Sequence, residues 1–235
     1  MRTKLIATLV MALLLGSSAM ADTGGNSVYI DQTNADQSTV SITQTGSNNN
    51  VGDSNTTTGT PFAIDGNSMS LTINQNGMNN SILGNFIGGN STMNLNQDGN
   101  SNASVLNMGN MGSGSGNYSL DLLGNNNSTT LNIGTTHDAG NYNFSAVVTG
   151  DSNTLTNTIN SKRTDNTFTV TGNSNAITTT QVGNNGTVNS AGHNITTSII
   201  GGSNVLNISQ DGVTNPNSVT VNVTGSNTTT NITQH

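Results

Sequence analysis

A short motif recurs along most of this chain. It consists of alternating apolar and polar residues followed by Gln, any residue, Gly, and an Asn or Ser close behind. A strand and turn of this length cannot bury a core alone, so the copies must stack on one another. The repeat therefore predicts a structural, self-stacking protein and argues against an enzyme.

Five copies of the motif are well preserved. In the first, Val40, Ile42 and Gln44 share parity and would face the same side of a strand. A lone buried Gln would cost about 1–3 kcal/mol, whereas stacked Gln side chains can donate and accept along a column. The Gly and the following Asn tolerate the backbone of a tight turn. The predicted column and turn residues are Ser38, Gln44, Gly46, Asn48, Gln75, Gly77, Asn79, Ser91, Gln97, Gly99, Gln181, Gly183, Asn185, Gln210 and Gly212.

The spacing of the turn glycines sets the expected size of a coil. Gly77, Gly88 and Gly99 are eleven residues apart, so a coil of two strands should take about 22 residues. The sequence thus predicts an all-β, cross-β (amyloid-like) β-solenoid over residues 22–235, with about nine or ten rungs about 4.8 Å apart. Four stretches break the period and are expected to be loop insertions, near 50–66, 109–117, 134–141 and 160–166.

The first 21 residues have the pattern of a secretory signal peptide. Arg2 and Lys4 precede an apolar run that is too short to span a membrane, and small residues end the segment at Ala21. After cleavage only Lys162 and Arg163 would remain against eleven acidic residues, a net charge of −9. This charge argues against nucleic acid as a partner, since little is left to neutralise phosphates.

The composition allows either disorder or a repetitive β-structure. Charged residues make up 6% and apolar residues 30% of the chain, and cysteine is absent. The regular alternation of aliphatic residues favours the β-structure, which must be stabilised by stacking without disulfides. The motif begins almost at the mature terminus and recurs to the last residues, Thr230, Ile232 and Gln234, so both ends are expected to be open edges.

These repeats resemble those of the curlins, the subunits of curli amyloid fibres. The family pattern is Ser, five residues, Gln, one residue, Gly and a short gap to Asn. Ser38, Gln44, Gly46 and Asn48 match it fully, and Ser91, Gln97 and Gly99 match closely. The resemblance implies a secreted, cell-surface subunit that polymerises with itself for adhesion and biofilm matrix, aided by a nucleator and an outer-membrane secretion channel. The chain departs from the family in its length, its irregular rungs and its brief segment after the signal.

Two other classes of function are weaker alternatives. The first is a monomeric β-solenoid that binds ice or carbohydrate. An ice-binding surface would need Thr side chains in regular rows, whereas the Thr runs of this chain fall at different positions of the repeat. An enzyme would need clustered catalytic groups, but the Asp residues are scattered, as at Asp53, Asp98 and Asp151. The histidines, His137, His193 and His235, lack ligand spacing, and no calcium-binding nonapeptide is present. We expect no catalytic site, no cofactor and no metal.

Overall fold

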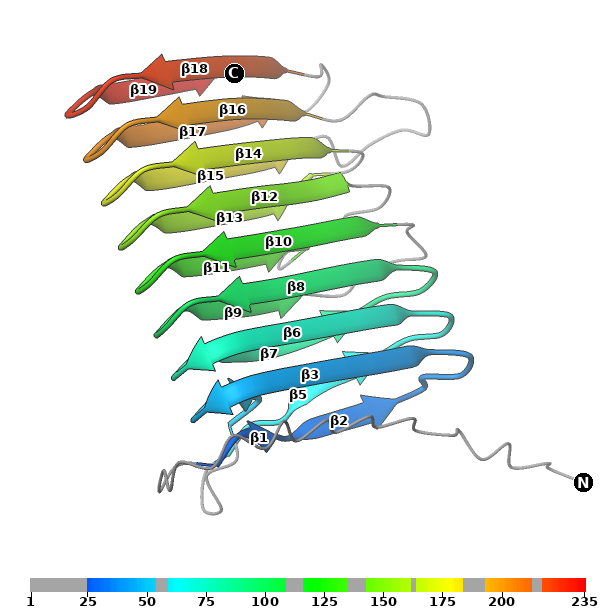
Figure 1. The fold of residues 1–235 in the computed structure, drawn as a ribbon. Helices are drawn as coiled ribbons and strands as arrows, with labels where there is room; N and C mark the ends of the chain where they lie inside the picture. The colour runs from blue at the N-terminus through cyan, green and yellow to red at the C-terminus, as the bar shows by residue number, and fades with distance from the viewer. Residues whose placement is uncertain are drawn as a thin grey trace, which may run out of the picture.

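The computed structural model describes residues 25–53, 59–108, 116–134, 143–161, 164–183, 193–212 and 217–235. These residues form strands and turns without a helix, and the parallel strands stack in coils (Figure 1). The prediction of an all-β β-solenoid is confirmed. One turn of the coil takes about 25 residues.

One face of the solenoid is an eight-stranded parallel sheet, visible in front in Figure 1. Its strands in chain order are β3 (Thr39–Ser47), β6 (Ser70–Met78), β8 (Thr92–Asp98), β10 (Asn117–Leu123), β12 (Asn143–Thr149), β14 (Asp165–Thr171), β16 (Asn194–Ile200) and β18 (Ser218–Thr224).

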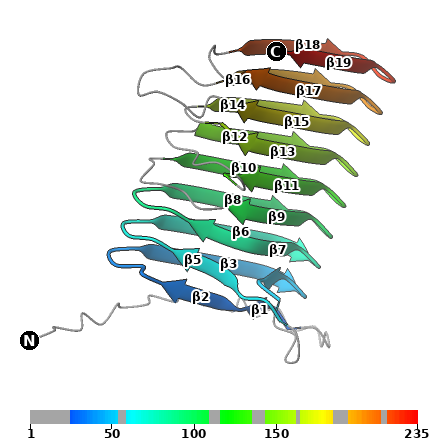
Figure 2. The same ribbon diagram turned by 180° about the vertical axis from the view of Figure 1, so that it is seen from behind.

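The opposite face, seen from behind in Figure 2, is an eleven-stranded sheet. Two short strands share each of its first two levels, β1 (Ser27–Val28) with β2 (Ile30–Thr33), and β4 (Asn50–Val51) with β5 (Phe62–Asp65). The later strands are β7 (Ser81–Ile87), β9 (Ala103–Met108), β11 (Ser128–Ile133), β13 (Thr154–Asn160), β15 (Ala176–Gly183), β17 (Val205–Gly212) and β19 (Thr229–Gln234).

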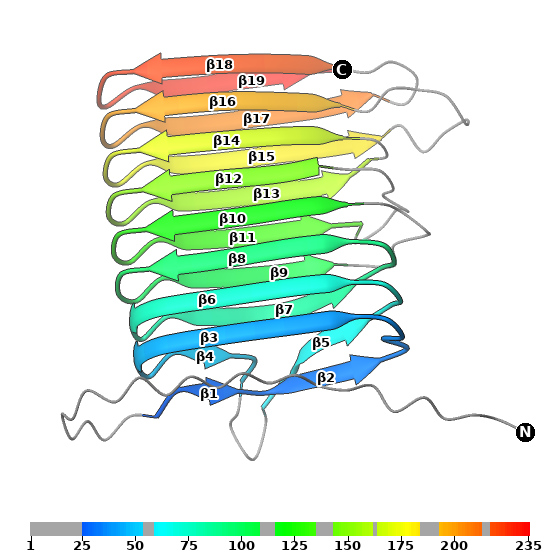
Figure 3. The same cartoon turned by 45° about the vertical axis from the view of Figure 1, so that its right-hand side comes forward.

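The chain alternates between the two sheets, and from β5 onward each strand pairs with the strand two places along (Figure 3). The pairing is in register, and like residues lie above like residues. Leu71 pairs with Met93, for example, and Ile73 pairs with Leu95. Because side chains alternate across a strand, every second residue from each sheet enters the space between the sheets. In β14, for example, Asn166, Phe168 and Val170 are buried, whereas the residues between them are exposed or half-buried.

The core is a narrow aliphatic column with a few aromatic rings. It runs from Val51 and Phe62 at one end to Val219 and Val221 at the other. Phe86 and Tyr118 meet edge to face, with ring centroids 6.0 Å apart. Because each coil contributes only a few buried side chains, burial depends on the coils above and below.

The coil length differs from the expected 22 residues. Ser70 pairs with Thr92 and Asn143 with Asp165, which are steps of 22 residues, but the paired amides of Gln44 and Gln75 are 31 apart and those of Gln181 and Gln210 are 29 apart. In the first of these longer coils the extra residues lie between β4 and β5, within one level of the eleven-stranded sheet. In the later coils they lie in the connections from the eleven-stranded sheet to the eight-stranded one. The predicted nine or ten rungs were too many because these insertions use up chain without adding strands.

Several predicted features lie outside the described residues. These are the signal segment, most of the insertions near 109–117 and 134–141, Lys162 and Arg163, and Asn185. The range 50–66 includes the short strands β4 and β5, so part of this predicted loop is strand.

Candidate functional site

A ladder of buried glutamines runs through the first coils of the eight-stranded sheet. Gln44 Nε2 donates to Gln75 Oε1 at 2.8 Å, and Gln75 Nε2 donates to Gln97 Oε1 at 2.9 Å. The three side chains are 7%, 1% and 1% exposed. Gln97 ends the ladder by donating to Ser104 Oγ at 3.0 Å. Each amide therefore bridges two coils inside the core.

A second glutamine ladder lies at the other end of the molecule and in the other sheet. Gln181 Nε2 donates to Gln210 Oε1 at 3.0 Å, and Gln210 Nε2 donates to Gln234 Oε1 at 3.0 Å. Gln97 and Gln181 do not meet, since β8 and β15 belong to different sheets. Between the ladders both columns are aliphatic, with Leu122 next to Gln97 and Ile159 next to Gln181.

The two ladders have the same local geometry. Glutamines of both ladders also donate across the core to a backbone carbonyl at the start of a strand in the facing sheet. Gln44 Nε2 reaches Ser27 O at 3.1 Å, and Gln210 Nε2 reaches Asn194 O at 3.2 Å. At the last coil, Gln234 Nε2 lies 3.4 Å from Ser218 O. The two halves of a coil are thus structurally equivalent.

A ladder of asparagines is more continuous than either glutamine ladder. Asn127 shows the pattern, since its Nδ2 donates to Gly150 O at 2.7 Å and its Oδ1 accepts from the backbone N–H of Asn153 at 3.0 Å. The half-buried Asn26 begins this asparagine ladder. Its buried members are Asn49, Asn80, Asn102, Asn127, Asn153, Asn175 and Asn204. Thr228 takes the final place and donates to Asn204 Oδ1 at 2.7 Å. These side chains satisfy turn backbone groups that would otherwise be buried without partners.

The asparagine ladder was missed by the sequence analysis, although its signal is regular. Asn follows three residues after each of the turn glycines Gly46, Gly77, Gly99, Gly124, Gly150, Gly172 and Gly201. The asparagines predicted from the motif lie one residue earlier, two positions after the glycine. Those residues, Asn48 and Asn79, are exposed and adopt left-handed backbone angles, with φ of 57° and 59°. They shape the turn, and the next residue forms the ladder.

The turn glycines are required by both backbone angle and space. Gly77 has φ of 118°, and a Cβ there would collide with the carbonyl oxygen of Gly99 in the next coil. Gly46, Gly99 and Gly183 also have positive φ. Gly212 pairs with Gly183 at the end of β17. The glycines therefore let successive turns stack at the spacing of the strands.

The predicted serines lie on the opposite edge from the asparagine ladder, where the chain returns to the eight-stranded sheet. Ser38 Oγ donates to Gly66 O and accepts from the backbone N–H of Met69, both at 3.1 Å. Ser91 is buried, and its Oγ donates to Gly89 O at 3.2 Å. Both hydroxyls stabilise these returning turns.

His193 occupies the same edge as the two serines, immediately before β16. Its side chain is fully buried, its Nδ1 accepts from the backbone N–H of Asn217 at 3.1 Å, and its Nε2 lies 3.3 Å from Val182 O. Burial away from water lowers the pKa of His193 below its ordinary value of 6.5, although the backbone of Val182 and Gly212 and the Asp211 carboxylate act in the opposite direction. The neutral ring with its proton on Nε2 fits these contacts.

We therefore expect acid to destabilise the last coils through His193. Its folded pKa is below the unfolded one, so the unfolded chain binds the extra proton first, and stability falls as the pH drops below about 6.5. Urea unfolding followed at pH 7.5 and pH 5.5 measures this loss. In His193→Asn, whose Oδ1 can replace Nδ1 as the acceptor, the difference between the two pH values should shrink. An unchanged difference in this variant would contradict the assignment.

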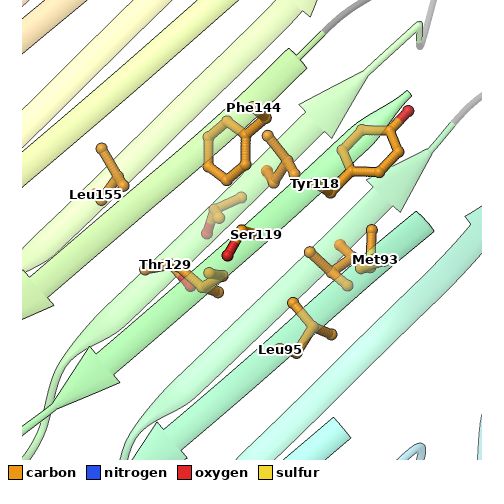
Figure 4. A pocket seen from close by; sticks show the side chains of 11 residues that line it. Met93, Leu95, Tyr118, Ser119, Thr129, Phe144 and Leu155 are labelled. Atoms are coloured by element: carbon orange, nitrogen blue, oxygen red, sulfur yellow. The ribbon is translucent and has the colours of Figure 1, made fainter. Parts of the chain in front are cut away.

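A cavity in the core between the two sheets is too small for a small-molecule ligand. This cavity, between Met93, Leu95, Tyr118 and Phe144, has a volume of about 10 Å³ (Figure 4). That is about the space of a single water molecule. Within the described part of the chain, no group of three or more His, Cys, Asp or Glu could hold a metal ion, and no helix is long and apolar enough to cross a membrane.

In the part of the chain that the structure describes, both ends of the solenoid are open strand edges. Among the described strands, β1, β2 and β3 at the first end and β18 and β19 at the other end have neighbours on one side only (Figure 3). The inward aliphatic side chains are fully buried in the middle coils but only partly buried here, as for Val28, Val40, Ile42, Val223 and Ile232. Such edges are templates for further strands.

Comparisons with known proteins identify no relative, since no family model, no curated protein and no solved structure matches the chain.

Proposed function

We propose that this protein is a secreted structural subunit that assembles with itself into extracellular, curli-like amyloid fibres for adhesion and biofilm matrix. The observation that carries the proposal is the pair of open ends, each with partly buried aliphatic residues and a ladder amide at its edge. A second copy would complete the burial of Val40 and Ile42 and extend the backbone hydrogen bonds. Under this proposal a nucleator and an outer-membrane secretion channel are the expected partners.

The direct test is assembly of the purified protein. Incubation at neutral pH should produce thioflavin fluorescence, unbranched filaments by electron microscopy, and diffraction spacings of about 4.8 and about 10 Å. A protein that stays monomeric in sedimentation at high concentration would contradict the proposal. Export of a tagged chain to the cell surface, and its loss on deletion of residues 1–21, would test the secretory part.

Gln44→Ala should slow assembly more than it disturbs the fold. Gln44 lies on β3, the edge strand of its sheet, where its only glutamine neighbour among the described residues is Gln75. Its loss leaves the buried Gln75 Oε1 without this donor, a cost of about 1–3 kcal/mol, and removes the amide nearest to an incoming copy. The lag time of thioflavin fluorescence measures the effect. Thr43→Ala, an exposed neighbour on the same strand, is the control and should assemble as the wild type does.

A second candidate function is a monomeric solenoid that binds ice or an insoluble carbohydrate. It is favoured by a rank of outward hydroxyl and amide groups along the eight-stranded sheet, where short polar side chains lie at one register position in every coil. The rank consists of Ser41, Thr72, Asn94, Ser119, Ser145, Thr167, Thr196 and Thr220. Thermal hysteresis or retention on cellulose or chitin by the monomer, without fibre growth, would support this function.

A further inference from the structure

The strand order constrains how two copies can stack. Along the chain each level of the eleven-stranded sheet is followed by a strand of the eight-stranded sheet, and the reverse. The first level, β1 and β2, and the last strand, β19, both belong to the eleven-stranded sheet. If the second copy is stacked without rotation, its β1 and β2 follow β19 of the first copy in the eleven-stranded sheet, with no strand of the eight-stranded sheet between them along the coil. The other sheet would lack one strand, and the edges of β18 and β3 would stay unpaired.

A half-turn of the second copy about the solenoid axis removes this mismatch. The first level of the second copy then lies on β18, and its β3 lies on β19. The alternation of strands continues across the junction, and neither sheet lacks a strand. The eight-stranded sheet of one copy is then continued by the eleven-stranded sheet of the next copy, and the eleven-stranded sheet by the eight-stranded one.

The side chains match in this arrangement. Both β3 and β19 have Thr at the first position, aliphatic or Thr side chains inward, and an inward Gln at the sixth position. Ile232 would lie against Ile42, and Gln234 against Gln44. On the other side, Val219 and Val221 of β18 would lie against Val28 and Ile30. In a single copy Val28, Ile30, Ile42 and Ile232 are only partly buried, whereas Val219 and Val221 are already buried.

The hydrogen bonds of the two glutamine ladders independently favour the half-turn orientation. Gln44 is 7% exposed, and its Oε1 has no hydrogen-bond partner although it is buried. Wherever two ladder glutamines meet within the molecule, the earlier one donates to the later one, as Gln210 does to Gln234. Gln234 Nε2 has a long contact of 3.4 Å with Ser218 O, and no described strand lies beyond β19 to accept from it. Across the half-turn junction, Gln234 Nε2 of one copy meets the free Gln44 Oε1 of the next.

We infer that copies of this chain stack head to tail with a half-turn between them, so that the C-terminal glutamine ladder of one copy continues into the N-terminal ladder of the next. This inference rests on the proposed fibre function. A head-to-tail contact that does not close generates an open filament. The half-turn makes that filament a continuous coil in which the two glutamine ladders become one ladder across each junction.

Disulfide trapping distinguishes the two orientations, and the chain has no cysteine of its own. Outward residues on paired parallel strands are about 4.8 Å apart, within the range that a disulfide can bridge. The half-turn pairs Thr229 with Thr39 of the next copy, whereas direct stacking pairs Thr229 with Ser27, its register equivalent in the same sheet. Two variants are therefore compared in oxidised fibres, Thr39→Cys with Thr229→Cys, and Ser27→Cys with Thr229→Cys.

The first variant should lose most of its monomer to a ladder of covalent oligomers on a non-reducing gel, and the second should remain largely monomeric. A third variant, Ser27→Cys with Ser218→Cys, should also cross-link, because the half-turn joins β1 to β18. A mixture of chains that carry only Thr39→Cys with chains that carry only Thr229→Cys should form covalent dimers and no longer oligomers. Fibres in which Ser27→Cys with Thr229→Cys cross-links, or in which no pair does, overturn the half-turn and leave the fibre proposal intact. Absence of wild-type fibres overturns both.

Discussion

Asn127→Ala should destabilise the folded monomer by about 3–5 kcal/mol. The change removes the donor to Gly150 O and the acceptor for the backbone N–H of Asn153. Both backbone groups are covered by the next coil, and each buried polar group without a partner costs about 1–3 kcal/mol. Asn153 Nδ2 also loses its 3.1 Å contact with Asn127 Oδ1. Urea unfolding of freshly diluted monomer measures the loss, and amide hydrogen exchange should locate it at this turn.

Asn207→Ala is the matched control. Asn207 is exposed on the outer face of β17, and its Nδ2 donates to Asn231 Oδ1 at 2.8 Å, so it too belongs to a stacked amide pair. Water replaces the partner when this side chain is removed, and the expected change is within about 0.5 kcal/mol. Equal losses in the two variants would show that the position inside the turn has no special role.

Gly124→Ala should be at least as damaging, with an expected loss of about 3 kcal/mol or more. Gly124 has φ of 124°, which an L side chain rarely adopts, and a Cβ there would collide with the carbonyl oxygen of Gly150. The backbone strain costs about 1–3 kcal/mol, and relief of the collision requires two stacked turns to separate. We expect the variant to unfold at lower urea and to assemble slowly, as measured by circular dichroism and thioflavin fluorescence.

Gly89→Ala tests whether any added methyl group has this effect. Gly89 lies in a turn on the other edge, and the nearest atom to a Cβ there is Asn67 O at 3.6 Å. No collision arises, so stability should change little or rise by up to about 1 kcal/mol through reduced freedom of the unfolded chain. A loss as large as that of Gly124→Ala would refute the stacking argument for the turn glycines.

The glutamine positions show what the local sequence pattern predicts about the structure and what it does not. The parity shared by Ile42 and Gln44 places both side chains inward, because side chains alternate along any strand. The pattern could not show that Gln97 and Gln181 lie in different sheets. Which sheet a strand joins depends on how many strands precede it, and the insertions obscure that number.

The amino-acid sequence by itself determined the strands, their inward residues, the turn glycines and the solenoid class, because each follows from a sequence pattern that spans about a dozen residues and recurs along the chain. The tertiary structure alone decided the length of each coil, the division of the glutamines between two sheets, and the sheet to which each open end belongs. These properties depend on the summed lengths of the connections. A solenoid tolerates an insertion at its edge without changing the strands on either side, so the strands carry no record of it.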